Sequence, residues 1–140
     1  TSVCSRRRKR AAMIVGVGTD IIETKRMRDA LRRHGAHFLE HVFAPAEIAS
    51  APDGAGRDNY FAARWAAKEA VAKALGTGIG ADCGWTDIVL HRNDAGKPRV
   101  ELLGRAAEKA RTLGIEQIHV SLSHERNFAT AVAVAENKTT

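Results

Sequence analysis

The pattern of apolar and polar positions predicts β-strands at both ends of the chain. Residues 13–19 form a short β-prone run with two glycines, and a glycine inside a strand indicates a bend or a close approach by another backbone. Residues 116–123 and 128–135 predict two more strands joined by a turn. A further pair is expected near residues 86–91 and 98–102, joined by a hairpin-type connection.

Between these runs, apolar residues recur at helical spacing. A helix is expected from about residue 22 to residue 33, with Gly35 as its stop, and short helical pieces follow over residues 36–50. A longer, alanine-rich helix is expected from about residue 59 to residue 75. Gly76 then stands where a glycine commonly ends a helix.

With a further short helix over residues 104–112, the predicted order is β-α-α-β-β-α-β-β. This order predicts an α+β fold with a mainly antiparallel sheet packed against a long helix. The chain has 140 residues, which is a usual size for one domain. We therefore expect a single domain over residues 13–140.

The positive charge of the chain is concentrated near its start. The formal net charge is +6, and Arg6–Arg10 contributes five positive charges, so the rest of the chain is nearly neutral. Such a block is typical of a nucleic-acid contact or a targeting signal. We favour the alternative, that residues 1–12 are a basic disordered leader or a cloning remnant, because Met13 lies where a natural start could be.

Composition argues against several other classes of protein. No apolar run approaches the roughly 20 residues that a membrane helix needs, and no apolar segment of a secretory signal follows the basic block. The two cysteines, Cys4 and Cys83, predict neither a disulfide framework nor a zinc site. A reducing, cytoplasmic setting is the simplest expectation.

Two acidic residues are candidates for a metal site. Asp20 follows the first apolar run, where it could cap a helix or bind a cation. Glu69 lies within the alanine-rich helix, where it could pair with Lys73 on the surface or act as a second ligand. The alanines around Glu69 would let another chain or a ligand approach closely, although alanine is also a good helix former. Mg²⁺ needs only one or two protein carboxylates, since water and phosphate oxygens complete its shell.

Basic side chains surround Glu69 in the sequence. Arg64, Lys68 and Lys73 lie within the same helix, and such residues can bind phosphate groups; the alternative is a solvated basic face. His124 ends a predicted strand, where it could bind phosphate or ribose, orient Glu69, or simply hydrogen-bond its own turn.

Four segments together resemble a known family. Gly16–Glu23, Arg64–Gly76, Gly96–Pro98 and Ser121–His124 occur in the order and spacing of bacterial holo-acyl-carrier-protein synthases. These enzymes are small 4′-phosphopantetheinyl transferases. The resemblance covers about residues 13–136, and its first two segments are specific in combination.

The resemblance implies a phosphopantetheinyl transferase fold and a transfer reaction. The enzyme would move 4′-phosphopantetheine from coenzyme A to a serine of apo-acyl carrier protein and release adenosine 3′,5′-bisphosphate. Asp20 and Glu69 match the Mg²⁺ ligands of the family, and Glu69, directly or through a bound water, matches the base for the serine proton. The positions of the family near the nucleotide and its phosphates are matched by Arg64, Lys68, Lys73, Gly76 and His124.

The resemblance also implies partners. Family members are homotrimers with sites between subunits, and they dock acidic carrier proteins on the first helix. Arg26 matches a docking arginine, and Arg33 extends the same basic stretch. Trp65 and Glu125 depart from the family pattern, and Glu125 leaves the contacts after His124 open. The choice between Mg²⁺ and Mn²⁺ and the type of carrier, fatty-acid or polyketide, also stay open.

Two other functions are weighed against the transferase. A basic nucleic-acid-binding module is favoured by Arg6–Arg10 and by the arginines at positions 26, 28, 32 and 33. Against it, aromatic residues make up only 5% of the chain and no stacking platform or binding motif is recognised. We therefore expect neither a nucleic-acid nor a membrane partner. The other alternative is a degenerate family member that binds carrier protein without turnover.

Overall fold

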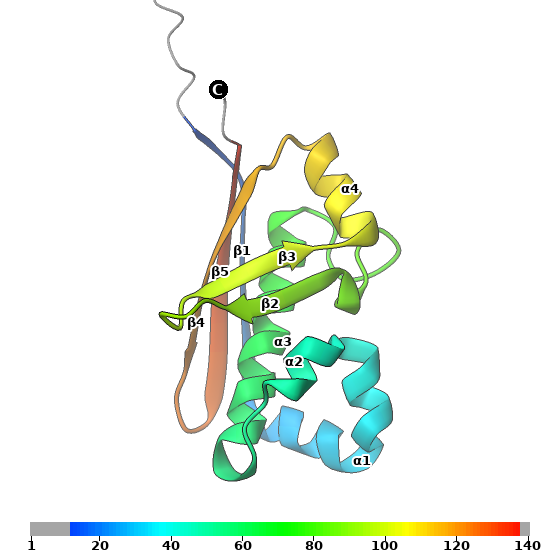
Figure 1. The fold of residues 1–140 in the computed structure, drawn as a ribbon, viewed down its shortest axis with the longest axis vertical. Helices are drawn as coiled ribbons and strands as arrows, with labels where there is room; N and C mark the ends of the chain where they lie inside the picture. Colours follow the sequence, from blue (N-terminus) through cyan, green and yellow to red (C-terminus); the bar gives the residue numbers. More distant parts are fainter. Residues whose placement is uncertain (1–11, 138–140) are drawn as a thin grey trace, which may run out of the picture.

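The computed structural model describes residues 12–137, so the predicted leader, with Cys4, lies outside the described residues except for Ala12. Within the described part, no helix is long and apolar enough to cross a membrane. The elements, drawn in Figure 1, are β1 (Met13–Glu23), α1 (Thr24–Val42), α2 (Pro45–Ala49), the 3₁₀ turn η1 (Gly54–Gly56), α3 (Arg57–Ala74), the 3₁₀ turn η2 (Trp85–Asp87), β2 (Ile88–Arg92), β3 (Pro98–Leu102), α4 (Gly104–Thr112), β4 (Gln117–His124) and β5 (Phe128–Asn137).

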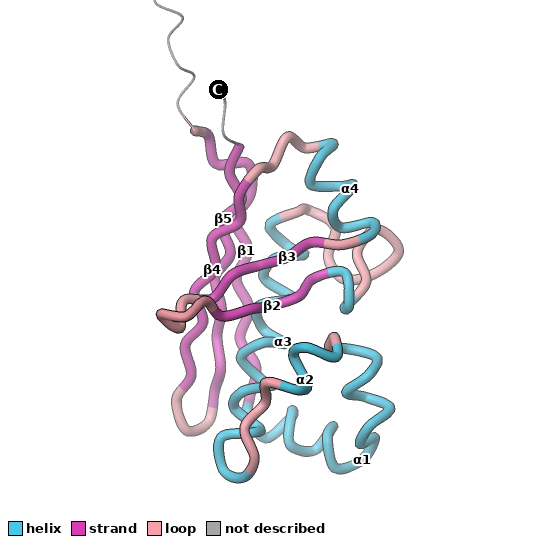
Figure 2. Tube along the Cα trace, viewed as in Figure 1, coloured by secondary structure: helices cyan, strands magenta, loops and turns pink. Residues whose placement is uncertain are grey.

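The strands form two antiparallel sheets rather than one. β1, β5 and β4 form a three-stranded sheet with β5 in the centre, and β2 and β3 form a separate hairpin. α3 packs against the sheet and also contacts β2. α1 and α2 lie towards one end of the molecule and α4 towards the other (Figure 2). The predicted α+β class, with antiparallel strands packed against a long helix, is confirmed.

β1 and α3 approach so closely that two positions of β1 must be glycine. A Cβ atom on Gly16 would lie 1.9 Å from the carbonyl oxygen of Ala74, and one on Gly18 would lie 1.9 Å from that of Ala70. The close approach predicted from these glycines is confirmed. Ala66 and Ala70 are fully buried, so the alanines of α3 serve the packing of helix on sheet. The small side chains thus permit close approach by another segment of the chain, β1, rather than by a ligand.

β1 continues past its predicted end. It pairs with β5 as far as Glu23, opposite Phe128, and Asp20 lies within this ladder opposite Ala131. Asp20 therefore does not cap a helix; Glu23 holds the cap position of α1. The cross-strand ladder decides the boundary here, because strand formation depends more on its neighbours than on local propensity. Gly35, the predicted stop of the first helix, is a kink with φ 50° and ψ −132°.

Candidate active site

A cluster of charged side chains forms where β1 packs on α3. Asp20 of β1 accepts a hydrogen bond from Lys73 of α3, with 3.2 Å between Oδ1 and Nζ. The Lys73 ammonium also donates to the carbonyl of Thr19 at 2.9 Å. Glu69 precedes Lys73 by about one turn on α3. Among the described residues Lys73 pairs with Asp20, so the alternative of a surface pair between Glu69 and Lys73 is not formed.

The carboxyl group of Glu69 interacts electrostatically with the carboxylate of Asp20. Burial raises the pKa of the Glu69 carboxyl, the neighbouring Asp20 carboxylate raises it further, and Lys73 opposes both. Two carboxylates that share a site repel each other unless a proton or a cation neutralises them. A partly buried carboxyl group perturbed in this way is a candidate for a functional site.

The residues present fit a hard divalent cation. Oδ2 of Asp20 is buried and has no hydrogen-bond partner among the residues that the structure describes, and such an atom requires an explanation. Over residues 12–137, no group of three His, Cys, Asp or Glu side chains could hold a metal. The donor set is therefore a pair of carboxylates, which suits Mg²⁺ when substrate phosphates and water complete the shell.

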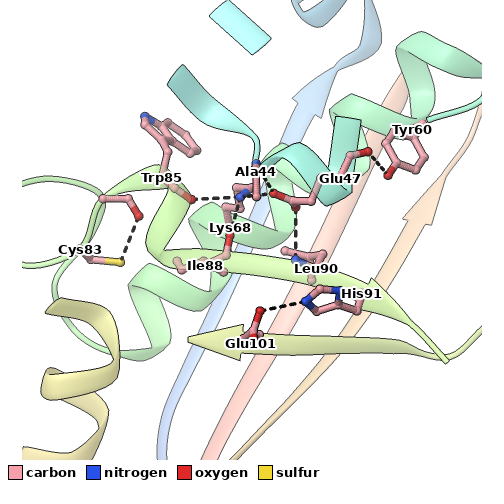
Figure 3. A network of polar contacts seen from close by, with 11 residues as sticks. Ala44, Glu47, Tyr60, Lys68, Cys83, Trp85, Ile88, Leu90, His91 and Glu101 are labelled. Carbon is pink, nitrogen blue, oxygen red and sulfur yellow. Dashed lines mark hydrogen bonds and ion pairs between the residues drawn. The ribbon is translucent and has the colours of Figure 1, made fainter. Parts of the chain in front are cut away.

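Lys68 does not face this cluster. It is fully buried, and its ammonium donates to Oε1 of Glu47 at 2.7 Å, to the carbonyl of Trp85 at 3.0 Å and to the carbonyl of Ile88 (Figure 3). These acceptors use every N–H of the ammonium group. Burial lowers the pKa of Lys68, and the Glu47 carboxylate opposes that shift. The geometry of this chain therefore offers Lys68 no ligand-facing surface, and a nucleotide contact has no support here.

Arg64 lies in a cationic hollow on another part of α3. Its guanidinium stacks on the Tyr60 ring, 3.6 Å from the centroid, and its Nε has no hydrogen-bond partner within the described residues. Burial lowers the pKa of Arg64, but arginine keeps its charge in proteins. The hollow has a volume of about 330 Å³ and is lined by Ala46, Ser50, Tyr60, Arg64, Leu90, His91 and Arg92.

Gly76 and His124 lie at the ends of their elements. Gly76 follows the end of α3 with a φ of 77° and donates its N–H to the carbonyl of Lys73 at 2.9 Å, so the predicted helix end is confirmed. His124 is exposed at the end of β4, and β5 separates β4 from β1. One chain thus brings Asp20, Glu69 and Lys73 together but leaves His124 apart from them.

The two predicted docking arginines are exposed on α1. Arg26 and Arg33 are about two turns apart on this helix, so they share a face. Arg28 is engaged elsewhere, because its Nε donates to Asp58 at 3.0 Å. The surface of α1 therefore presents separated, accessible positive charges.

The sequence alone did not point to three residues of these sites, Glu47, Tyr60 and Arg92. Tyr60 precedes Arg64 by four residues, and this spacing on a helix is a readable signal for a stacked cation. Glu47 has no such signal: its partners Lys68 and Leu90 are far away in the chain. Arg92 reaches the hollow only because β2 folds back beside α3.

Comparison with known proteins assigns the family. Residues 16–133 match the model of the 4′-phosphopantetheinyl transferase superfamily. A protein named holo-[acyl-carrier-protein] synthase from Maridesulfovibrio salexigens is 43% identical over 124 residues, which cover 89% of this chain and 99% of that protein. A protein of the same name from Edwardsiella ictaluri is 46% identical over 123 residues, with coverage of 88% and 98%.

Solved structures agree with this assignment. The crystal structure of holo-[acyl-carrier-protein] synthase from Neisseria meningitidis gives a TM-score of 0.82 at 34% identity, over 89% of this chain and 100% of that chain. The Helicobacter pylori enzyme in complex with coenzyme A gives 0.76 at 32% identity, over 85% and 98%. The resemblance noted in the sequence is confirmed, and the chain belongs to the 4′-phosphopantetheinyl transferase superfamily.

Proposed function

We propose that this chain transfers 4′-phosphopantetheine from coenzyme A to a serine of apo-acyl carrier protein. The observation that carries the proposal is the meeting of Asp20 and Glu69, from two separate elements, beside Lys73. The relatives named holo-[acyl-carrier-protein] synthase and the similar structure that contains coenzyme A support it. The carboxylates and the ammonium group supply the charges that phosphoryl-type chemistry needs.

In this reaction the serine oxygen forms a bond to the phosphorus next to pantetheine. The bond from that phosphorus to the bridging oxygen breaks, and adenosine 3′,5′-bisphosphate leaves with the electron pair. Glu69, directly or through a water molecule, accepts the serine proton, so it must be ionised. Lys73 offsets the negative charge of the phosphates, and no covalent enzyme intermediate is needed.

Asp20 and Glu69 are the residues that would hold Mg²⁺. The unpartnered oxygen of Asp20 and the raised pKa of Glu69 both favour a nearby cation. When bound, the ion supplies charge neutralisation on the phosphate oxygens. Mn²⁺ accepts the same oxygen ligands, so the donor set does not discriminate between the two metals.

The nucleotide end of coenzyme A is assigned to basic residues outside this pair. Arg64 is buried in the wall of the cationic hollow beside Arg92, and its unpartnered Nε offers a donor for a phosphate group. Gly76 leaves the backbone at the end of α3 open to a ligand. His124 lies across the sheet, so its predicted contribution requires a neighbouring subunit.

The test of this function is a mass measurement. The purified chain is mixed with coenzyme A, Mg²⁺ and apo-acyl carrier protein, and the carrier is expected to gain the mass of one phosphopantetheine. Carriers of the fatty-acid and polyketide type are tried in parallel. No mass gain with either Mg²⁺ or Mn²⁺ would exclude the transferase function; coenzyme A binding by calorimetry would then identify a family member without turnover.

We also propose a cytoplasmic location. Cys83 is a buried free thiol, and reducing compartments keep thiols in this form. Coenzyme A and carrier protein would meet the enzyme there.

The proposed homotrimer is supported by an apolar surface on the three-stranded sheet. Val17 and Ile21 of β1 are 55% and 64% exposed, and Phe128 and Val132 of β5 are 40% and 36% exposed. These residues alternate with the buried positions, so they share the face of the sheet that points away from α3. Within the described residues, the helices lie on the other side of this sheet (Figure 1). Contiguous exposed apolar surface of this kind is typical of subunit interfaces.

Ile21→Lys is expected to dissociate the proposed trimer into smaller species and to reduce turnover. A charge on this face opposes burial against another subunit, and the sites between subunits are lost with the assembly. Light scattering after size-exclusion chromatography measures the mass of the particle. Leu113→Lys is the matched control, because Leu113 is a 36% exposed apolar residue at the end of α4. An unchanged mass for Ile21→Lys would contradict this interface.

Arg26→Glu is expected to raise the KM for carrier protein about fivefold or more, with little change in the KM for coenzyme A. An acidic carrier loses an attractive charge and meets a repulsive one, and charge complementarity chiefly governs encounter. Steady-state kinetics at low and at high salt measure the effect, which salt should weaken. Arg32→Glu, an exposed arginine on the same helix, is the control. Equal changes in both KM values would contradict a docking role.

A further inference from the structure

The buried ion pair of Glu47 and Lys68 connects the elements around the active site. Both side chains are fully buried, with 2.7 Å between Oε1 and Nζ. Oε1 of Glu47 also accepts the N–H of Ala44 at 2.9 Å, and Oε2 accepts the N–H of Leu90 at 3.2 Å (Figure 3). Burying two charges is costly, and such a pair often adds little stability compared with apolar residues of similar size. A contribution to stability therefore does not explain this pair, and we expect another role.

The pair ties one side of α3 to three other elements. Glu47 belongs to α2, and the carbonyls that accept from Lys68 belong to Trp85 of η2 and Ile88 of β2. Lys68 is adjacent to Glu69 in the chain, so the two side chains leave the helix about 100° apart. Lys68 faces α2 and β2, whereas Glu69 faces β1.

On the opposite side of the helix, α3 packs against β1 through residues with small side chains or none. Gly16 and Gly18 have no side chains, and the facing residues Ala70 and Ala74 have only methyl groups. Close packing of this kind fixes the distance between strand and helix, but it has few interlocking groups to resist rotation of the helix about its own axis. Within the described residues, the hydrogen bonds across this contact come from Lys73, to the carbonyl of Thr19 at 2.9 Å and to Asp20 at 3.2 Å, and the Lys73 side chain is about half exposed. Buried hydrogen bonds that orient α3 must come from elsewhere.

We propose that the Glu47–Lys68 pair is a positioning device that fixes the rotation of α3 and so holds Glu69 against Asp20. The inference rests on the proposed function. A side chain at the surface of a helix lies about 5–6 Å from the axis, so a rotation of 10–20° moves its end by about 1–2 Å. A displacement of about 1 Å at a reacting group can cost about a hundredfold in rate. Glu47 and Lys68 themselves do not touch substrate; they act through Glu69.

Glu47 also contacts the wall of the cationic hollow, through its backbone and through its carboxylate. The Tyr60 hydroxyl donates to the backbone carbonyl of Glu47, and the Leu90 N–H donates to its carboxylate. Tyr60 and Leu90 both line the hollow that contains Arg64. Loss of the pair therefore affects the binding of coenzyme A as well as turnover, but it leaves the exposed arginines of α1 in place.

Glu47→Gln and Lys68→Met test the proposal in the mass-spectrometric transfer assay. Glutamine has the same shape as glutamate and keeps one acceptor oxygen. Glu47→Gln therefore tests the positioning role even if Lys68→Met does not fold. At a temperature where circular dichroism shows the native fold, Glu47→Gln is expected to lower kcat at least tenfold and to raise the KM for coenzyme A. The KM for carrier protein is expected to stay within twofold.

Ile115→Ala is the control for a general loss of stability. Ile115 is a core residue beyond the end of α4, and it lines a small pocket with residues of β3, α4 and β4, so its truncation leaves a cavity there. It is expected to lower the melting temperature but to keep kcat within twofold. The proposal is overturned if Glu47→Gln keeps kcat within twofold, or if Ile115→Ala loses as much kcat. Turnover by the unaltered enzyme in the same assay separates either result from a failure of the proposed function.

Discussion

Glu69→Gln will lower kcat by about 10²–10⁴-fold, the range expected when a general base is removed. The amide cannot accept the serine proton and is a poor metal ligand. The same change will make the metal-free enzyme more stable. Burial and the Asp20 charge raise the pKa of Glu69 in the folded protein, so its ionised form costs stability at neutral pH, and glutamine removes that cost. Turnover by mass spectrometry and thermal melts without metal measure the two effects.

Glu108→Gln is the matched control for this prediction. Glu108 is exposed on α4, so the same loss of charge there should change neither kcat nor the melting temperature. Added Mg²⁺ should raise the melting temperature of the unaltered protein more than that of Glu69→Gln. Near-normal turnover by Glu69→Gln would remove Glu69 from the mechanism.

Gly18→Ala will destabilise the protein by more than about 3 kcal/mol, beyond the usual cost of an overpacked core. The new Cβ would lie 1.9 Å from the carbonyl oxygen of Ala70, and this atom belongs to the backbone of a buried helix, which cannot move aside alone. α3 must separate from β1, and Glu69 must separate from Asp20 with it. We therefore expect a melting temperature lower by about 10 °C or more and little turnover by the protein that remains folded.

Gly80→Ala provides the comparison. No atom lies within 4 Å of a Cβ built on Gly80, and its φ is not positive. The change should stay within about 0.5 kcal/mol, as is usual for surface substitutions. Thermal and denaturant melts of both variants give the difference. Equal stability of Gly18→Ala and the unaltered protein would contradict the close packing of β1 on α3.

Much of the fold could be predicted from the sequence, because the local sequence patterns agree with the tertiary structure. The glycines of β1 predicted a close approach, and the alanine-rich helix with Gly76 at its end is found nearly as expected. The end of β1 was not readable. Pairing with β5 continues the strand to Glu23, and this pairing depends on residues more than a hundred positions later in the chain.

The active site could be predicted from the sequence only in part, because it too depends on contacts between residues that are far apart in the chain. Asp20 is a carboxylate in an apolar run, and Glu69 is a carboxylate in an alanine-rich helix, so each could be identified as a candidate from its local sequence. Only the family resemblance predicted that the two act together. Lys68 was grouped with its basic neighbours because the sequence does not show which side of α3 it occupies. Its partner Glu47 comes from a short helix whose pattern resembles an ordinary surface turn, and only folding makes it a buried acid.

The pleat of β1 constrains how this enzyme can change. Asp20 points to α3, and its neighbour Ile21 points to the outer face proposed for subunit contacts. Because successive side chains of a strand alternate, deletion or insertion of a single residue in the regularly paired part before Asp20, residues 16–19, would exchange the two faces in one event. Chemistry and assembly would then be lost together. This part of the strand can therefore diverge by replacing side chains one at a time but not by changing its length, whereas the start of β1 already accommodates a register irregularity between Ile14 and Gly16.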